Sequence, residues 1–147
     1  MKNRGIFWGA LTGIVFLDIL TKFGAQKYLF VPYKILPFLK LEFVENSNLA
    51  FGIEFPRIWI ILLSLVALGV LGNIFVKNVR KTSKIGAFAF GIIFGGAIAN
   101  LGERIIFAHV TDFVALSIIP NFNLADTALT LGVATLIIFH TKIFKKN

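Results

Sequence analysis

The sequence predicts an all-α integral membrane protein, a four-transmembrane-helix bundle that carries a small β-like segment on its extracytoplasmic surface. Its 147 residues are 57% hydrophobic and 15% charged, whereas a soluble domain has about 25% charged residues. Long uncharged runs alternate with short charged segments. Basic residues predominate at both ends of the chain and between the second and third runs. This length and pattern fit one membrane domain that covers residues 1–147.

Four segments are apolar enough to cross a bilayer as helices, which takes about 20 residues each. These spans are expected at about residues 5–29, 58–76, 85–104 and 123–142. The uncharged part of the first span ends at Leu17 and is too short alone, so the span must include Asp18 and Lys22. Asp18 then lies roughly 20 Å along the helix, toward the far side of the bilayer.

The charges set the orientation of these spans. Three links hold basic residues and no acid: Lys2, Arg4, Lys77, Arg80, Lys81, Lys84, Lys142, Lys145 and Lys146. All 7 acidic residues lie on the other side. Because cytoplasmic loops are enriched in Lys and Arg, both termini are expected in the cytoplasm. The net charge of +8 therefore reflects topology, and we expect no nucleic-acid partner.

Two segments remain for the outer surface, at about residues 32–56 and 107–121. The first alternates apolar residues with the charged residues Lys34, Lys40, Glu42 and Glu45. This alternation predicts short strands on the membrane surface. The second is apolar but too short to cross again, and we expect it to rest at the interface with Asp112 embedded in it.

Polar residues near the outer ends of the spans are candidates for function, because a charge at membrane depth costs a few kcal/mol. Asp18 and Lys22 share one helix face. An ion pair at the interface is the favoured interpretation for Lys22, while structural and functional roles for Asp18 remain equally open. Asn100 and Arg104 also share a face in the third span.

Small residues in the third span, Gly91, Gly95 and Ala99, recur at four-residue spacing. This spacing favours close helix packing. Packing accounts for the glycines, but it does not account for the polar pair that follows them near the outer end of the same helix.

Two carboxylates, Asp112 and Asp126, stand at the two ends of the segment that returns to the membrane. If this segment is a surface excursion, both can reach the top of the bundle. Two close carboxylates share a proton, so one can activate water as a base while the other acts as an acid. An Asp at a helix start is also a common N-cap, and this alternative fits Asp126 better than Asp112.

No metal or cofactor is expected. Cys is absent, and His109 and His140 are expected near opposite membrane faces. The chain also contains no G-x-S-x-G motif and no phosphate-binding glycine loop.

Four strings in order, DILTK, NSNLAFG, GGAIANLGER…VTDF and PNFNLAD, resemble the lipoprotein signal peptidases, also called signal peptidase II. Each string alone is common, but the ordered set is specific and covers nearly the whole chain. The resemblance implies that Asp112 and Asp126 are the catalytic pair. It also implies a set of residues that line the site and position the substrate or the carboxylates: Asp18, Asn46, Asn100, Arg104 and Asn123.

The sequence departs from the family pattern at four positions. Ile19 stands where the family usually has Gln, Asn48 and Ala99 where it has Gly, and Glu103 where it has Asp. None of these changes removes a catalytic carboxylate. The resemblance therefore implies an active enzyme from a divergent branch.

The implied reaction is the removal of signal peptides from diacylglyceryl-modified bacterial prolipoproteins, with the cut before the lipidated Cys. The implied partners are these substrates and the bilayer of the cytoplasmic (inner) membrane. Two alternatives are an inactive relative that binds lipoproteins and a small membrane transporter subunit. Retention of both Asp112 and Asp126 argues against the first, and the gathering of all acids on one side argues against the second.

The topology gives a direct prediction. Reporter fusions at either terminus and at Lys81 should report a cytoplasmic location, and a fusion at Glu45 should report an outer one, because of the distribution of basic residues. The measurement is the activity of a reporter that functions on one side of the membrane only. A reporter at Lys81 on the outer side would refute the four-span topology.

Overall fold

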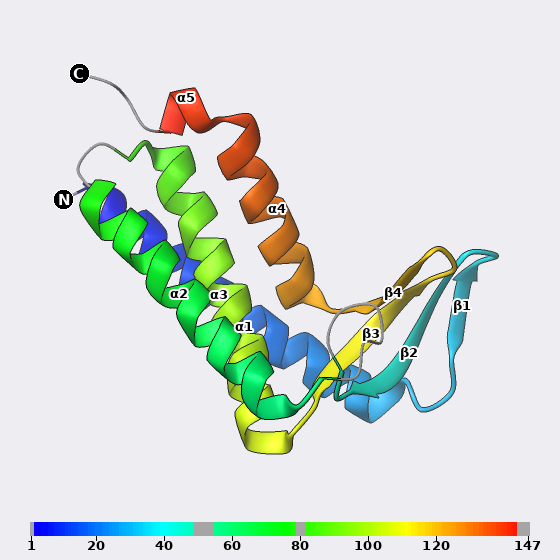
Figure 1. The fold of residues 1–147 in the computed structure, drawn as a ribbon. Helices are drawn as coiled ribbons and strands as arrows, with labels where there is room; N and C mark the ends of the chain where they lie inside the picture. The colour runs from blue at the N-terminus through cyan, green and yellow to red at the C-terminus, as the bar shows by residue number, and fades with distance from the viewer. Residues whose placement is uncertain (1, 49–54, 79–81, 144–147) are drawn as a thin grey trace.

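The computed structural model describes residues 2–48, 55–78 and 82–143. Four basic residues named in the sequence analysis, Arg80, Lys81, Lys145 and Lys146, lie outside these residues, and so does the end of the string NSNLAFG. Figure 1 shows long helices that lie side by side and a sheet at one end of them. The helices are α1 (Lys2–Tyr28), α2 (Arg57–Asn78), α3 (Lys84–Phe107), α4 (Leu124–Ile138) and the short α5 (His140–Ile143).

Three helices, α1, α2 and α3, are long and apolar enough to cross a membrane. Helix α4 is apolar but has only 15 residues, which corresponds to roughly 22 Å at 1.5 Å per residue. The span expected at about residues 123–142 is thus not one continuous helix, and as a membrane crossing it stays a prediction. Phe139 interrupts the helix, and α5 continues the chain from His140.

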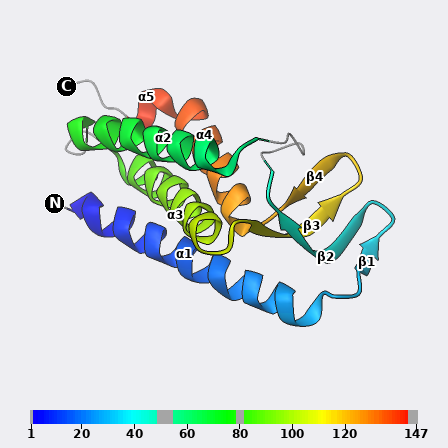
Figure 2. The same ribbon diagram turned by 60° about the horizontal axis from the view of Figure 1, so that its bottom comes forward.

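Helix α3 is the centre of the bundle and contacts α1, α2 and α4; Figure 2 shows it between α1 and α2. Glycines allow the close approach of its neighbours. A Cβ atom at Gly91 would lie 2.6 Å from the carbonyl oxygen of Phe7, and one at Gly95 would lie 2.8 Å from that of Leu11. The close packing expected from these glycines is confirmed, and α1 is the helix that they admit.

A third glycine brings α4 against another face of α3. A Cβ atom at Gly96 would lie 2.5 Å from the carbonyl oxygen of Ala125, in the first turn of α4. The spacing pattern did not include this residue. Two faces of α3 are thus closely packed, which places the beginning of α4 beside the polar end of α3.

Helix α2 is attached mainly through aromatic packing. The ring of Phe75 stacks on Phe7 at 4.5 Å between centroids and lies 5.1 Å from the ring of Phe90. Ile60 and Phe75 are the buried residues of α2. Most of its other side chains are exposed and apolar, as expected for a helix that faces lipid.

The sheet has four antiparallel strands in the order β1-β2-β3-β4. Their bounds are Tyr33–Leu36, Leu39–Asn46, Val110–Leu116 and Ile119–Phe122. The strands expected within residues 32–56 are confirmed as β1 and β2. The segment at 107–121, expected to be a simple surface excursion, forms β3 and β4, so the sheet is larger than the β-like segment that the sequence predicted.

Pairing of β2 with β3 places one of the candidate carboxylates. Val44 lies opposite Asp112, and Asn46 lies opposite Val110. The chain enters β3 through Ala108, which ends α3 in the left-handed conformation with φ of 69°. This conformation reverses the chain direction at the end of a helix. It carries Asp112 back over the bundle.

The glycine packing can be tested with a matched pair in α3. Gly96→Ala should lower the free energy of unfolding by about 1–3 kcal/mol, because the added methyl group overpacks against the α4 backbone. Gly102→Ala should not lower it, because a Cβ atom there meets nothing within 4 Å. The measurement is the thermal unfolding of both variants in one detergent. Equal midpoints would contradict the packing described.

Candidate active site

The sheet lies at one end of the helices (Figure 1), and the polar residues predicted for the site belong to the helices and strands that meet there. They come from three helices (α1, α3 and α4), from two strands (β2 and β3) and from the residue before α4. The structure joins them by hydrogen bonds or around one cavity: Asp18, Asn46, Asn100, Arg104, Asp112, Asn123 and Asp126. Three of them, Asp18, Asp112 and Asn123, are almost fully buried.

Asn123 lies at the centre of this cluster and begins α4. Its side-chain oxygen accepts the backbone N–H of Asp126 at 2.9 Å, and the Asp126 carboxylate accepts the backbone N–H of Asn123 at 3.2 Å. This reciprocal arrangement is a capping box. The N-cap interpretation of Asp126 is therefore wrong in detail, because Asn123 is the N-cap and Asp126 is its partner one turn inside.

Asp112 receives a hydrogen bond at each carboxylate oxygen. The Asn123 Nδ2 donates to Oδ1 and the Asn46 Nδ2 donates to Oδ2, each at 2.8 Å. Burial raises the pKa of Asp112 to about 6, against the opposing effect of the Asn46 bond. The charge of Asp126 raises this pKa further. Asp112 is thus a carboxyl group that can hold a proton near neutral pH.

Asp126 is oriented by α3 as well as by its own helix. The Asn100 Nδ2 donates to its Oδ1 at 2.8 Å. The Asn100 oxygen accepts from Asn123 Nδ2 at 3.2 Å and from Lys22 Nζ at 2.8 Å. Asn100 and Asn123 therefore tie the two carboxylates into one hydrogen-bonded network.

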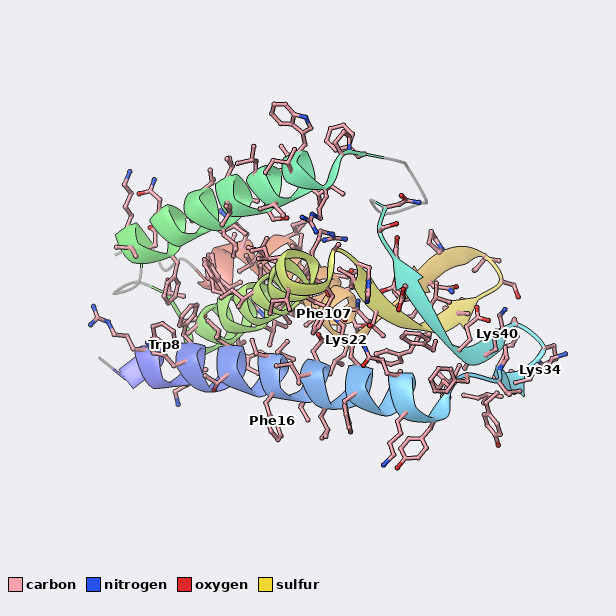
Figure 3. The ribbon with its side chains drawn as sticks, turned by 90° about the horizontal axis from the view of Figure 1, so that it is seen from below. Trp8, Phe16, Lys22, Lys34, Lys40 and Phe107 are labelled. Carbon is pink, nitrogen blue, oxygen red and sulfur yellow. The ribbon has the colours of Figure 1, made fainter. Side chains whose placement is uncertain are left out.

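Asp18 fastens α1 to the first turn of α4, because its Oδ1 accepts the backbone N–H of Ala125 at 2.9 Å. Its Oδ2 pairs with Lys22 at 2.7 Å. The ion pair expected for Lys22 is confirmed, but it is buried in the bundle. Figure 3 shows Lys22 on the face of α1 that is turned toward α3, while Phe16 points away.

Glu103, one of the departures from the family pattern, pairs with Lys22 at 2.7 Å. The sequence analysis did not include Lys22 and Glu103 among the site residues. The available signal was the depth of their charges in the membrane, since each such charge needs a partner. Asn48, another departure, needs no positive φ, because Ala108 is the one described non-glycine residue with such a value. Its backbone N–H donates to Asn46 Oδ1.

A cavity of about 770 Å³ opens beside the cluster. It runs between α2 and α4, against α3 and beneath β4. Its polar end is formed by Arg104, Asp112 and Asp126 together with Asn46 and Asn48. The rest of its wall is largely apolar and includes Ile60, Leu68, Leu71, Ile93, Leu129 and Leu131. The cavity thus brings a long apolar surface to the two carboxylates.

Arg104 is the cation at this end of the cavity. Its Nη2 donates to the Asn48 carbonyl oxygen at 3.4 Å, and its charge acts on both Asp112 and Asp126. Within the described ranges, no group of three or more His, Asp or Glu is arranged to hold a metal ion. The chemistry that this arrangement can support is acid–base catalysis by two carboxyl groups.

Comparison with known proteins identifies the family. The family model described as Signal peptidase (SPase) II matches residues 10–142. The lipoprotein signal peptidase of Caldicellulosiruptor bescii is 38% identical over 135 residues, which cover 89% of this chain and 87% of that protein. The lipoprotein signal peptidase of Aquifex aeolicus is 32% identical, with 99% of this chain and 93% of that protein covered.

A solved structure agrees with these relatives. A bacterial membrane enzyme determined by the in meso method at 2.3 Å resolution superposes with a TM-score of 0.82 at 26% identity. The superposition covers 94% of this chain and 88% of that one. The fold is therefore that of a bacterial membrane enzyme. The chain belongs to the signal peptidase II family.

The buried position of Asp112 predicts its titration. Asp112 should lose its proton near pH 6, whereas an ordinary Asp does so near 3.8. The folded protein binds this proton more tightly than the unfolded chain does, so protonation of Asp112 stabilises the fold. This stabilisation is complete below the ordinary Asp pKa of 3.8 and is lost as the pH rises to about 6. The measurement is the infrared absorbance of protonated carboxyl groups across this range. If wild type and Asp112→Asn give the same titration, the assignment is wrong.

Proposed function

We propose that this protein is a membrane aspartic endopeptidase that removes signal peptides from diacylglyceryl-modified prolipoproteins and cuts before the lipidated Cys. The observation that carries the proposal is the pair Asp112 and Asp126, bridged by Asn123 at the polar end of an apolar cavity. The names of its relatives, lipoprotein signal peptidases, support this substrate class.

The proposed reaction needs one ionised and one protonated carboxyl group. The ionised carboxylate takes a proton from water, and the water oxygen bonds to the carbonyl carbon of the substrate peptide. The protonated carboxyl group donates to the carbonyl oxygen. When the C–N bond breaks, the leaving amine takes a proton from the pair. The raised pKa of Asp112 supports this sharing of one proton near neutral pH.

The cavity suits an apolar helix that enters sideways from the lipid. Its wall from α2 is largely apolar, and α4 adds Leu129 and Leu131; a signal peptide has an apolar core. The scissile bond would then lie at the polar end, beside Arg104, Asp112 and Asp126. Entry of the substrate helix into this cavity does not require α1 and α3 to separate. These two helices are closely packed at Gly91 and Gly95.

We further propose that α4 and α5 together make the fourth crossing of a single membrane domain. The apolar character of α4 and its packing on α3 support this. Both termini would lie in the cytoplasm, and the active site would face the extracytoplasmic side of the inner membrane. The basic residues at the chain ends and the acids at the site support this orientation.

The catalytic pair can be tested by substitution. Asp112→Asn and Asp126→Asn should each lower the cleavage rate by at least about 10²- to 10⁴-fold, because Asn keeps the shape but cannot transfer the proton. The losses should not add in the double variant, because the two carboxylates act as one unit. The measurement is the gel shift of a diacylglyceryl-modified prolipoprotein after incubation with purified protein.

Glu45→Gln is a matched control, since Glu45 is an exposed carboxylate on the neighbouring strand β2. Thermal unfolding of every variant separates loss of activity from loss of fold. Cleavage at the wild-type rate by both Asp112→Asn and Asp126→Asn would refute the aspartic mechanism. An inactive wild-type protein that still binds the substrate would favour the alternative of a lipoprotein-binding relative.

A further inference from the structure

The side chain of Lys22 is a buried charge that the proposed reaction does not use. It is 5% exposed. Its ammonium group lies 2.7 Å from the carboxylates of Asp18 and Glu103 and 2.8 Å from the side-chain oxygen of Asn100. The ammonium group has three N–H donors, and the structure provides three acceptors. One carboxylate would be enough for an ion pair, so the contact with Asn100 calls for a separate explanation.

The chemistry of these groups determines which way the Asn100 amide faces. An ammonium group can only donate hydrogen bonds, and an ionised carboxylate can only accept them. The amide oxygen must therefore face Lys22, and the amide NH₂ group must face Asp126. A rotation of the amide by 180° would place oxygen against carboxylate and NH₂ against ammonium. Lys22, together with the Asn123 NH₂ group that donates to the same oxygen at 3.2 Å, thus selects the orientation in which Asn100 donates to Asp126; the shorter of the two contacts, 2.8 Å, and the positive charge are those of Lys22.

The two carboxylates hold the ammonium group at the point where it can do this. Asp18 approaches it from α1, and Glu103 approaches it from α3. Asp18 is itself fixed by the backbone N–H of Ala125 in α4. The position of the ammonium group is therefore determined by three helices, and its remaining N–H reaches Asn100.

We infer that Lys22 is a positioning residue for the proposed cleavage, acting through Asn100 to hold the Asp126 carboxylate in the orientation needed for proton transfer. This inference rests on the proposed function. Asp126 Oδ1 is held by Asn100, and Oδ2 by the backbone N–H of Asn123. Without the first bond the carboxylate can turn about its Cβ–Cγ bond. A displacement of about 1 Å at a reacting group can cost about 10²-fold in rate.

The test uses a charge-balanced variant, because Lys22→Met alone leaves two buried carboxylates without their cation and can fail to fold. Lys22→Met combined with Glu103→Gln removes one positive and one negative charge, so the net charge of the cluster is unchanged. Glu103→Gln alone is the reference for this variant. Lys27→Met, at an exposed position on the same helix, controls for loss of a lysine.

The assay is steady-state cleavage of a diacylglyceryl-modified prolipoprotein by the full chain, with a thermal unfolding curve for each variant. The Lys22→Met/Glu103→Gln variant should have a kcat about 10²-fold below that of Glu103→Gln, with little change in KM. Lys27→Met should match the wild type. In an Asn100→Ala background, the same pair of changes should lower kcat no further than Glu103→Gln does, because Lys22 acts through Asn100.

Three results would overturn the inference. The first is a kcat for the charge-balanced variant equal to that of Glu103→Gln. The second is a loss that adds in full to that of Asn100→Ala, which would mean that Lys22 acts elsewhere. The third is failure of the charge-balanced variant to fold, which would make Lys22 a folding residue. Failure of the proposed function is a separate result, in which the wild-type protein itself does not cleave the substrate.

Discussion

The hydrogen bonds of the Asn123 side chain hold the sheet, α3 and α4 in one arrangement. The two N–H donors of its NH₂ group lie 2.8 Å from Asp112 Oδ1 and, in longer contacts, 3.2 Å from Asn100 Oδ1 and 3.3 Å from the Thr111 carbonyl oxygen, measured from Nδ2. Its oxygen accepts the backbone N–H of Asp126. The residue is fully buried, and each of these groups would cost about 1–3 kcal/mol if it lost its partner without access to water. Any movement of α4 relative to β3 would break several of these bonds together. The Asn123 amide therefore links the positions of the Asp112 and Asp126 carboxylates.

Close helix packing makes this network possible. Polar side chains at the end of a bundle can bond each other only if the helix backbones come near enough. Gly91 and Gly95 bring α1 to α3, and Gly96 brings α4 to α3. The Asp18 carboxylate can then reach the Ala125 backbone in α4. The polar site thus depends on the close helix packing, and a larger residue at one of these glycines would alter the site.

The site combines a rigid part with an open part. The two carboxylates lie on β3 and on the first turn of α4, and hydrogen bonds that are buried or partly buried fix both. Rigid elements of this kind hold catalytic groups more accurately than loops do. Helix α2, by contrast, has few buried residues and forms one wall of the cavity. The geometry therefore keeps the carboxylates in place beside an apolar cavity, one wall of which is formed by α2.

The sequence by itself determined the apolar helices, the strands within residues 32–56 and several of the polar residues that meet in the structure. Hydrophobic runs, alternation and the cost of charge in lipid are local properties, so they can be read along the chain. The ordered motifs added the family and the pair Asp112 and Asp126.

Only the tertiary structure decided how these residues meet. Strand β3 forms because it pairs with β2, and β4 then pairs with β3. The pairing of β3 with β2 is long-range and leaves no local signal in the sequence. The N-cap of α4 is Asn123 and not Asp126, because the N-cap is the residue at which the helix begins, and only the structure shows where that is. Lys22 and Glu103 entered the network from different helices. Their role follows from three-dimensional proximity, since a buried charge takes whichever partners the packing brings within reach.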